Sequence, residues 1–132
     1  MSVSDAPAEA GPEATYFGHL ARGELMVQQC EGCDRWVFYP RIACPHCGSR
    51  ALRFRRPSGR GVVYATSVVR PRPGTGEPYN VALIDLEEGP RMMGRIEGLA
   101  PEAVRIGLDV RAEVDTSGEA PVVVFRPAGE AR

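Results

Sequence analysis

The sequence predicts a mostly β protein, in which a short N-terminal helix and a cysteine-containing ribbon precede a five-stranded barrel. Three observations support this fold class. Two Cys-x-x-Cys pairs lie close together within residues 30–47. Short runs rich in Val, Ile and Tyr recur in the second half of the chain, and turns containing Gly or Pro separate them. Fifteen Gly and twelve Pro among 132 residues favour many turns and short strands over long helices.

The N-terminal region is predicted to be a disordered tail followed by a short helix. Residues 1–14 are rich in Ala, Pro and Glu and show no hydrophobic periodicity, which is typical of a disordered segment. Thr15 can cap a helix and Gly23 can end one, so we expect a helix within residues 15–24. Its apolar face is predicted from three residues at helical spacing, Phe17, Leu20 and Ala21. Because so short a helix is unstable alone, it must dock on this chain or on a partner.

Residues 25–57 are predicted to form a ribbon around the cysteines. Strand-like segments precede, separate and follow the cysteine pairs, at Leu25–Gln29, Trp36–Tyr39 and Ala51–Arg55. Three aromatic side chains of the middle segment are expected to pack between the ribbon and the barrel: Trp36, Phe38 and Tyr39.

Residues 58–128 are predicted to form the barrel, followed by a loose tail at 129–132. Five strand segments are separated by turns, at Gly61–Arg70, Tyr79–Leu86, Arg91–Glu97, Leu108–Asp115 and Pro121–Arg126. The strand count and the short connector at Ala100-Pro101-Glu102 fit a five-stranded barrel of the OB type. An SH3-like barrel is the alternative, and the strand count alone does not separate the two.

The two cysteine pairs predict a metal site. Cys30-Glu-Gly-Cys33 is followed, after ten residues, by Cys44-Pro-His-Cys47. Two such turns place four sulfur atoms where they can converge tetrahedrally on one zinc ion. Two residues that tolerate a left-handed backbone follow the pairs at equivalent positions, Asp34 and Gly48.

We expect this zinc to be structural. Four cysteine ligands fill a tetrahedral site and leave no position for a catalytic water. Residues 25–55 are too few to bury a stable core, and zinc binding supplies on the order of 10–16 kcal/mol to small modules of this kind. His46 is interpreted as a solvent-facing turn residue. Iron could fill the same four thiolates, as in a redox protein of the rubredoxin type, and the sequence leaves that alternative open.

Basic side chains are unevenly distributed along the chain. All 16 are Arg, and the segment from Arg35 to Gly76 holds nine of them without one Asp or Glu. A positive surface there could meet phosphate groups or an acidic partner.

The N-terminus gives no indication of export or of membrane insertion. Met1–Ala14 has neither a basic start nor an apolar block, and no apolar run approaches the roughly 20 residues of a membrane span. We therefore expect a cytoplasmic protein without a membrane partner, in a compartment where paired cysteines are metal ligands rather than disulfides.

No set of catalytic side chains is recognisable. His19 and His46 are the only histidines, and the cysteines are assigned to the metal. The Gly-rich segment 73–76 lacks the Lys and the helix of a phosphate-binding loop. Because an enzyme needs a nucleophile or an acid–base pair, the sequence predicts a chain that is not an enzyme by itself.

Several motifs occur together in a fixed order. They are Tyr16-Phe17, the cysteine ribbon ending in Cys47-Gly48-Ser49, Ser58-Gly59-Arg60-Gly61-Val62-Val63-Tyr64, the strand from Pro78 to Leu86, Arg105-Ile106-Gly107 and Phe125-Arg126-Pro127. In this order the chain closely resembles the DUF35 family, zinc-ribbon OB-fold proteins associated with acyl-CoA metabolism. The resemblance covers about residues 15–128.

The resemblance implies a rubredoxin-like zinc ribbon joined to an OB barrel. It also implies a non-catalytic subunit that supports a thiolase-like enzyme, or a MaoC-type enoyl-CoA hydratase, and helps to form its acyl-CoA site. Such subunits form hetero-oligomers, for example of two plus two chains, and relatives act in lipid or aromatic-compound degradation. The family has no diagnostic catalytic residue to carry over.

A coenzyme A thioester is therefore the expected ligand. Its phosphates suit Arg side chains, and Arg70 and Arg72 border the loop between the first two barrel strands, a common ligand edge in OB barrels. The alternative function is a nucleic-acid-binding zinc-ribbon OB module. The barrel strands offer few aromatic residues and no Lys, and the isoelectric point is near 6.1, so we expect no nucleic-acid partner.

Overall fold

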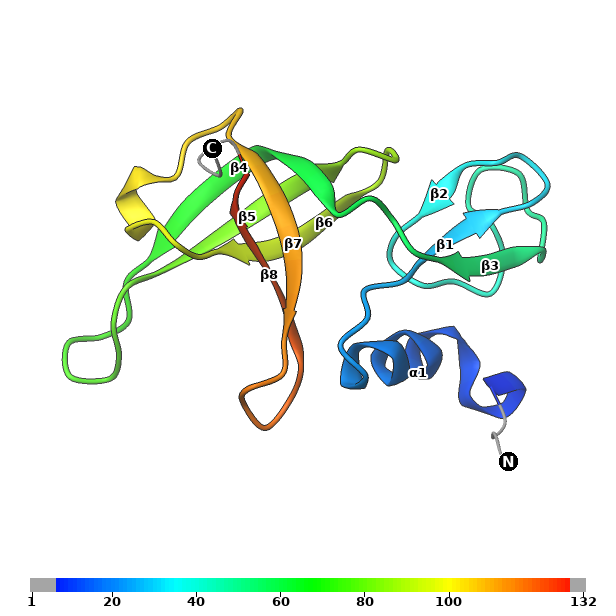
Figure 1. Cartoon of the computed structure of the whole chain (residues 1–132), viewed down its shortest axis with the longest axis horizontal. Helices are drawn as coiled ribbons and strands as arrows, with labels where there is room; N and C mark the ends of the chain where they lie inside the picture. The colour runs from blue at the N-terminus through cyan, green and yellow to red at the C-terminus, as the bar shows by residue number, and fades with distance from the viewer. Residues whose placement is uncertain (1–6, 129–132) are drawn as a thin grey trace. The chain divides into compact units, whose positions relative to one another are not determined.

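The structure, a computed structural model, describes residues 7–128. The chain divides into a helix–ribbon unit, which runs to Pro57 and also includes residues 88–90 and 114–122, and a barrel unit that begins at Ser58. One N-terminal helix, a three-stranded sheet and a closed five-stranded barrel follow one another along the chain (Figure 1). The predicted fold class, mostly β with a short N-terminal helix, is confirmed.

The helix begins earlier than the sequence predicted. Helix α1 spans Pro7–Ala21 and is kinked at Gly11, whose φ of 77° is not helical. Pro12 opens the longer part of the helix, where a missing N–H costs nothing. Thr15 is therefore not the cap: its hydroxyl donates to the Gly11 carbonyl, 2.8 Å away, from inside the helix. The disordered tail predicted for 1–14 is wrong from Pro7 onward, and its first six residues lie outside the described part.

The buried face of α1 also differs from the prediction. Tyr16 and Leu20, four residues apart, are 4% and 2% exposed, whereas Phe17 is 46% exposed. Burial, and then the nearby Tyr39, raises the pKa of Tyr16 to about 12. The predicted stop is correct, because Gly23 has a φ of 82° and its N–H donates to the Leu20 carbonyl over 2.8 Å.

The ribbon is a three-stranded antiparallel sheet of β1 (Val27–Cys30), β2 (Trp36–Val37) and β3 (Leu52–Arg55), in the order β2-β1-β3. Two of its aromatic residues pack on the helix, and the expected packing of this segment against the barrel stays a prediction. The rings of Phe38 and Tyr39 lie 5.6 and 6.2 Å from that of Tyr16. These ring contacts give the short helix the docking surface that it needs.

A buried amide fixes the loop that follows the second ribbon strand. Gln28 is 3% exposed, and its side chain donates to the Arg41 carbonyl at 2.8 Å. The same amide accepts from the Arg41 N–H at 2.7 Å. The buried polar group is thereby satisfied, and the chain is held in position as it approaches the second cysteine pair.

Five strands close the barrel in the order β4-β5-β6-β8-β7. Their bounds are Arg60–Val69, Tyr79–Leu86, Arg91–Ile96, Asp109–Asp115 and Val122–Pro127 for β4, β5, β6, β7 and β8. The third and fifth of these strands pair in parallel, whereas an SH3-like barrel pairs its strands largely in chain order. A 3-10 turn at Pro101–Ala103 fills the predicted connector. The barrel is therefore of the OB type.

The barrel core packs closely around Phe125, which is 0% exposed. Gly94 on β6 lies against this ring, because a Cβ added there would sit 2.7 and 2.8 Å from two ring carbons. Asn80 is the buried polar residue of the barrel, at 2% exposure. Its amide donates to the Thr66 hydroxyl at 2.7 Å and accepts from the Ile96 N–H at 3.0 Å, so it ties β4, β5 and β6 together.

The contact between Gly94 and Phe125 predicts the effect of one added methyl group. Gly94→Ala should lower the free energy of unfolding by about 1–3 kcal/mol, because the ring has no room to retreat. Gly118→Ala is the control, since its Cβ would meet nothing within 4 Å. Urea unfolding followed by far-UV circular dichroism measures both. Equal midpoints for the two variants would show that the barrel core is looser than described.

Candidate metal centre

The two Cys-x-x-Cys turns have the same backbone geometry. In each, the N–H of the first cysteine donates to the carbonyl five residues later at 2.8 Å. The carbonyl of that cysteine accepts from the N–H four residues later, from Asp34 at 2.7 Å and from Gly48 at 2.8 Å. Both of these residues are left-handed, with φ values of 67° and 81°, as the sequence predicted. Asp34 is the one described non-glycine residue with a positive φ. This unusual backbone conformation is used to form the first cysteine turn.

The turns bring the four sulfur atoms together. Cys30, Cys33, Cys44 and Cys47 are free thiols, and their Sγ atoms all lie within 4.8 Å of one another. The Cys30–Cys47 and Cys33–Cys44 sulfur atoms are 3.6 and 3.7 Å apart. Four sulfur ligands at about 2.3 Å from a tetrahedral zinc ion would be separated by about 3.8 Å. The residues present therefore fit one metal ion of this size and geometry.

Backbone N–H groups point at two of these sulfur atoms. Gly32 N–H donates to Cys30 Sγ at 3.2 Å, and His46 N–H donates to Cys44 Sγ at 3.3 Å. Burial acts to raise the pKa of Cys30, but the N–H groups of Cys33 and Gly32 outweigh it and lower that pKa to about 7. The turns are thus built to stabilise negative charge on sulfur.

The closeness of the thiols opposes ionisation of Cys47 when no cation lies between them. At Cys47 the N–H of Ser49 favours the thiolate, yet the Cys30 thiol and burial prevail and raise the Cys47 pKa to about 11. A divalent ion would reverse this, since each thiolate would then face positive charge. One buried cluster of the ribbon is built around these cysteines: Cys30, Val37 and Cys44, with Cys33 and Leu52 beside them.

The histidines take no part in the thiol cluster. The exposed His46 has its Nδ1 atom 3.0 Å from a guanidinium nitrogen of Arg35, which agrees with its interpretation as a turn residue. His19 lies in the last turn of helix α1, and its Nδ1 is 3.1 Å from a Glu24 carboxylate oxygen and 2.9 Å from a guanidinium nitrogen of Arg22.

The positive segment is partly neutralised by carboxylates from outside it. Arg53 and Arg55 on β3 both pair with Glu31, at 2.7 and 3.3 Å. Arg70 pairs with Glu102 at 3.2 Å. Within the described part of the chain, carboxylates from outside the acid-free run therefore pair with three of its nine arginines.

Arg70 and Arg72 are the residues expected to contact coenzyme A. Arg70 directly follows β4, and Arg72 lies in the loop after it. The Arg72 carbonyl accepts from the Thr75 N–H at 3.0 Å, which closes a turn there. The structure does not gather the two side chains in a pocket. Both side chains are exposed, and their candidacy for phosphate contact rests on that exposure and on their positive charge.

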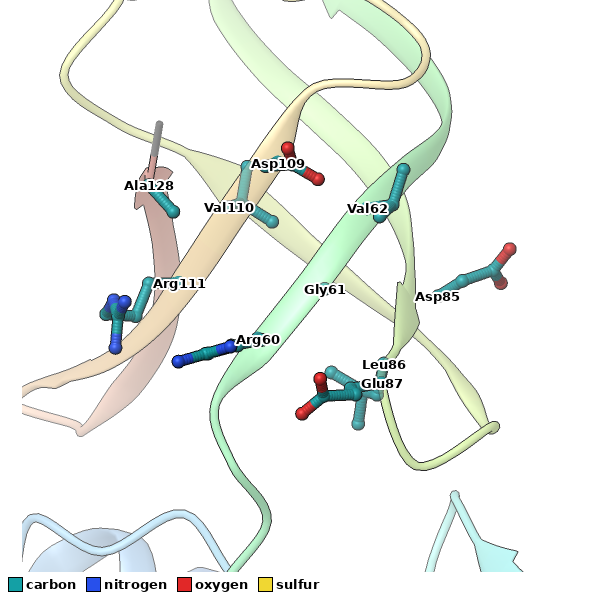
Figure 2. Close-up of a pocket in the computed structure, with 10 residues that line it drawn as sticks. All are labelled: Arg60, Gly61, Val62, Asp85, Leu86, Glu87, Asp109, Val110, Arg111 and Ala128. Atoms are coloured by element: carbon teal, nitrogen blue, oxygen red, sulfur yellow. The ribbon is translucent and has the colours of Figure 1, made fainter. Parts of the chain in front are cut away.

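A pocket of about 640 Å³ lies instead on the barrel, against β4, β5 and β7 (Figure 2). Arg60 and Arg111, which face each other across β4 and β7, line it together with apolar surface from Leu86 and Val110. Three acidic residues line the same pocket, so its charge is mixed: Asp85, Glu87 and Asp109. Sequence reasoning missed this pocket because it depends on which strands pair.

No helix in the described part of the chain, residues 7–128, has both the length and the apolar character to cross a membrane.

Comparison with known proteins identifies both units. A model of the ChsH2 rubredoxin-like zinc ribbon domain matches residues 17–53, and a model of the ChsH2 C-terminal OB-fold domain matches residues 54–115. A DUF35 domain-containing scaffold protein of Methanocaldococcus jannaschii is 37% identical over 109 residues, which are 76% of this chain and 77% of that protein.

Two further similarities are to a hydratase subunit and to a chain of an aldolase structure. A probable enoyl-CoA hydratase alpha subunit of Thermomonospora curvata is 34% identical over 125 residues, 92% of this chain, but the chain spans only 39% of that protein's length. The solved structure of an Ltp2-ChsH2(DUF35) aldolase contains a chain that matches with a TM-score of 0.77 and 34% identity. The match covers 92% of this chain and 98% of that one.

The sulfur cluster predicts that metal binding and ribbon folding are lost together. Purified protein should contain one metal ion per chain, and Cys44→Ser should lose it, with a change in the fluorescence of Trp36 on β2 as the ribbon unfolds. His46→Ala is the control, because His46 lies between two ligands in sequence but contributes only its N–H to the turn. Elemental analysis and fluorescence measure both. Full metal content in Cys44→Ser would contradict the four-sulfur site.

Proposed function

This chain belongs to the DUF35 family, whose members join a rubredoxin-like zinc ribbon to an OB-fold domain, and we propose that it is a non-catalytic subunit of an acyl-CoA enzyme complex. The single observation that supports this most directly is the match to nearly the whole length of a chain in the Ltp2-ChsH2(DUF35) aldolase structure. In the proposed role the chain binds a thiolase-like enzyme, or a MaoC-type hydratase, and supports its acyl-CoA site.

The arrangement of chemical groups fits a supporting role. The four cysteines surround a single position and would fill the coordination of a metal ion held there. The two histidine rings lie apart from that cluster, at the end of α1 and on the surface of the second turn. No step of a reaction is therefore assigned to the residues of this chain.

We propose zinc as the metal, with Cys30, Cys33, Cys44 and Cys47 as its ligands. Zinc would supply structural energy rather than chemistry, since it has no redox function and this ligand set leaves no open position. The small apolar core of the ribbon supports this, because the cysteines themselves make up most of it. Iron in the same site would colour the purified protein, and a colourless protein with one zinc per chain removes the redox alternative.

The proposed role predicts a stable hetero-complex. A tagged form of this chain, expressed in its native host, should recover a thiolase-like protein or a MaoC-type hydratase. The mass measured by light scattering should correspond to a hetero-oligomer, with two copies of each chain as the expected composition. The isolated chain should turn over no acyl-CoA thioester. Recovery of this chain alone under gentle conditions, or thioester turnover without a partner, would contradict the proposal.

The proposed ligand of the complex is a coenzyme A thioester, with Arg70 and Arg72 as the phosphate contacts. Replacing both by Gln should weaken thioester binding by the complex roughly tenfold or more, because a charge-assisted hydrogen bond contributes about 1.5–3 kcal/mol. Isothermal titration calorimetry measures the affinity. The matched control replaces two other arginines, Arg60 and Arg111 in the barrel pocket, by Gln. Weaker binding in the control alone would move the phosphate site to that pocket and reject the loop assignment.

A further inference from the structure

One outer face of the barrel carries exposed apolar side chains that the barrel itself does not cover. On β4, Val62 and Tyr64 are 40% and 48% exposed, and Met93 on β6 is 65% exposed. The register places Leu83 of β5 opposite Met93, and it places Ala65, next to Tyr64, opposite Leu83. Apolar groups therefore form a continuous row across three neighbouring strands.

Two arginines of β6 frame this row. The Arg91 guanidinium carbon lies 3.4 Å from the centroid of the Tyr64 ring, and Arg91 Nε is 2.6 Å from an Asp85 carboxylate oxygen. The Arg95 guanidinium lies 4.8 Å from the centroid of the Tyr79 ring. We call this face, made of Val62, Tyr64, Leu83, Met93, Arg91 and Arg95, the outer patch.

We propose that the outer patch is the surface through which this chain docks on its enzyme partner. The partner would present apolar side chains to Tyr64 and Met93, and a carboxylate to Arg95. This inference rests on the proposed function, because it assigns a surface to the partner named there.

The composition of the patch favours a protein partner. Tyr, Met and Arg are enriched in protein interfaces, and Tyr and Arg supply much of the binding energy where such interfaces have been dissected. The barrel is closed, so it offers no open strand edge for a partner to extend. Docking on this face must therefore use side chains, and the side chains available are of the types that interfaces use.

The contacts within the patch prepare it for binding. The stacked guanidinium holds the Tyr64 ring, and the Asp85 carboxylate holds that guanidinium, while about half of the Tyr64 side chain stays accessible. A side chain that is already ordered loses less conformational entropy when a partner covers it. The exposed ring is thus a preorganised anchor.

The charge of the outer patch favours some kinds of binding partner over others. The patch contains two arginines, and Asp85, which lies beside it and pairs with Arg91, leaves a net charge of +1. Face-to-face pairing of two copies would bring like charges together in a surface removed from water, which is unfavourable. Nucleic-acid bases would need the ring face of Tyr64, on which Arg91 already lies. A protein partner with apolar groups and a carboxylate avoids both the like-charge repulsion and the need for the Tyr64 ring face.

Substitutions within the patch test the proposal in the intact chain. The Tyr64→Ser/Met93→Ser double variant should bind the enzyme partner at least about 100-fold more weakly, because it removes both central apolar contacts. Arg95→Glu should lower the association rate and reduce its dependence on salt, because it reverses the charge that meets the partner's carboxylate. Ile106→Ser is the control: Ile106 is 70% exposed in the same unit but outside the patch, so binding should not change. Surface plasmon resonance with the immobilised partner measures all three.

The outcomes separate the docking surface from the proposed function. If the wild-type chain binds the partner and the double variant binds equally well, the outer patch is not the interface, although the subunit role stands. If the wild-type chain binds no enzyme partner, both proposals fail. Loss of self-association, or of single-stranded DNA binding, in the double variant with partner affinity unchanged would assign the patch to another occupant and overturn the inference. Circular dichroism and metal content confirm that each variant is folded.

Discussion

Four sulfur atoms held within 4.8 Å of one another set the main constraint on the helix–ribbon unit. Cys30 ends β1, the central strand of the sheet, and Cys44 begins the second turn, so closing the cluster fixes how the ribbon folds back on itself. Few apolar residues share that core, and burial of their surface alone cannot stabilise a module of this size. The aromatic contacts of α1 then depend on the ribbon, because Phe38 and Tyr39 follow directly after β2.

The barrel is stabilised differently from the ribbon, by a packed apolar core. Its core is conventional, with Phe125 and Ile84 fully buried, and one buried amide joins β4, β5 and β6. Some of its arginines pair with carboxylates on the surface, as Arg126 does with Glu113 at 2.9 Å. Such exposed pairs contribute only about 0–1 kcal/mol each, so they set the charge pattern rather than the stability. What distinguishes one face is that Arg91 and Arg95 lie over tyrosine rings.

Local patterns in the sequence predicted the features that depend on neighbours along the chain. The cysteine turns with Asp34, and the strand Tyr79–Leu86, agree with the structure because spacing and alternation determine them. The start of α1 was missed because Gly11-Pro12 was not interpreted as a helix opening. Its buried face was missed because Tyr16 and Phe17 fit helical spacing equally well, and packing on Phe38 selects Tyr16. The outer patch depends on strand register and could not be predicted.

Both units contain features that restrict motion, and such restriction would suit the proposed role as a supporting subunit. A surface that changes little on binding loses little entropy, so modest contacts suffice for a stable complex. Closure of the barrel fixes the backbone of β4, β5 and β6, and the stacked arginines fix the side chains above them. A metal-bound ribbon would be fixed in the same way by its four ligands. The thiols of this chain converge on one another, which agrees with the proposed supporting role.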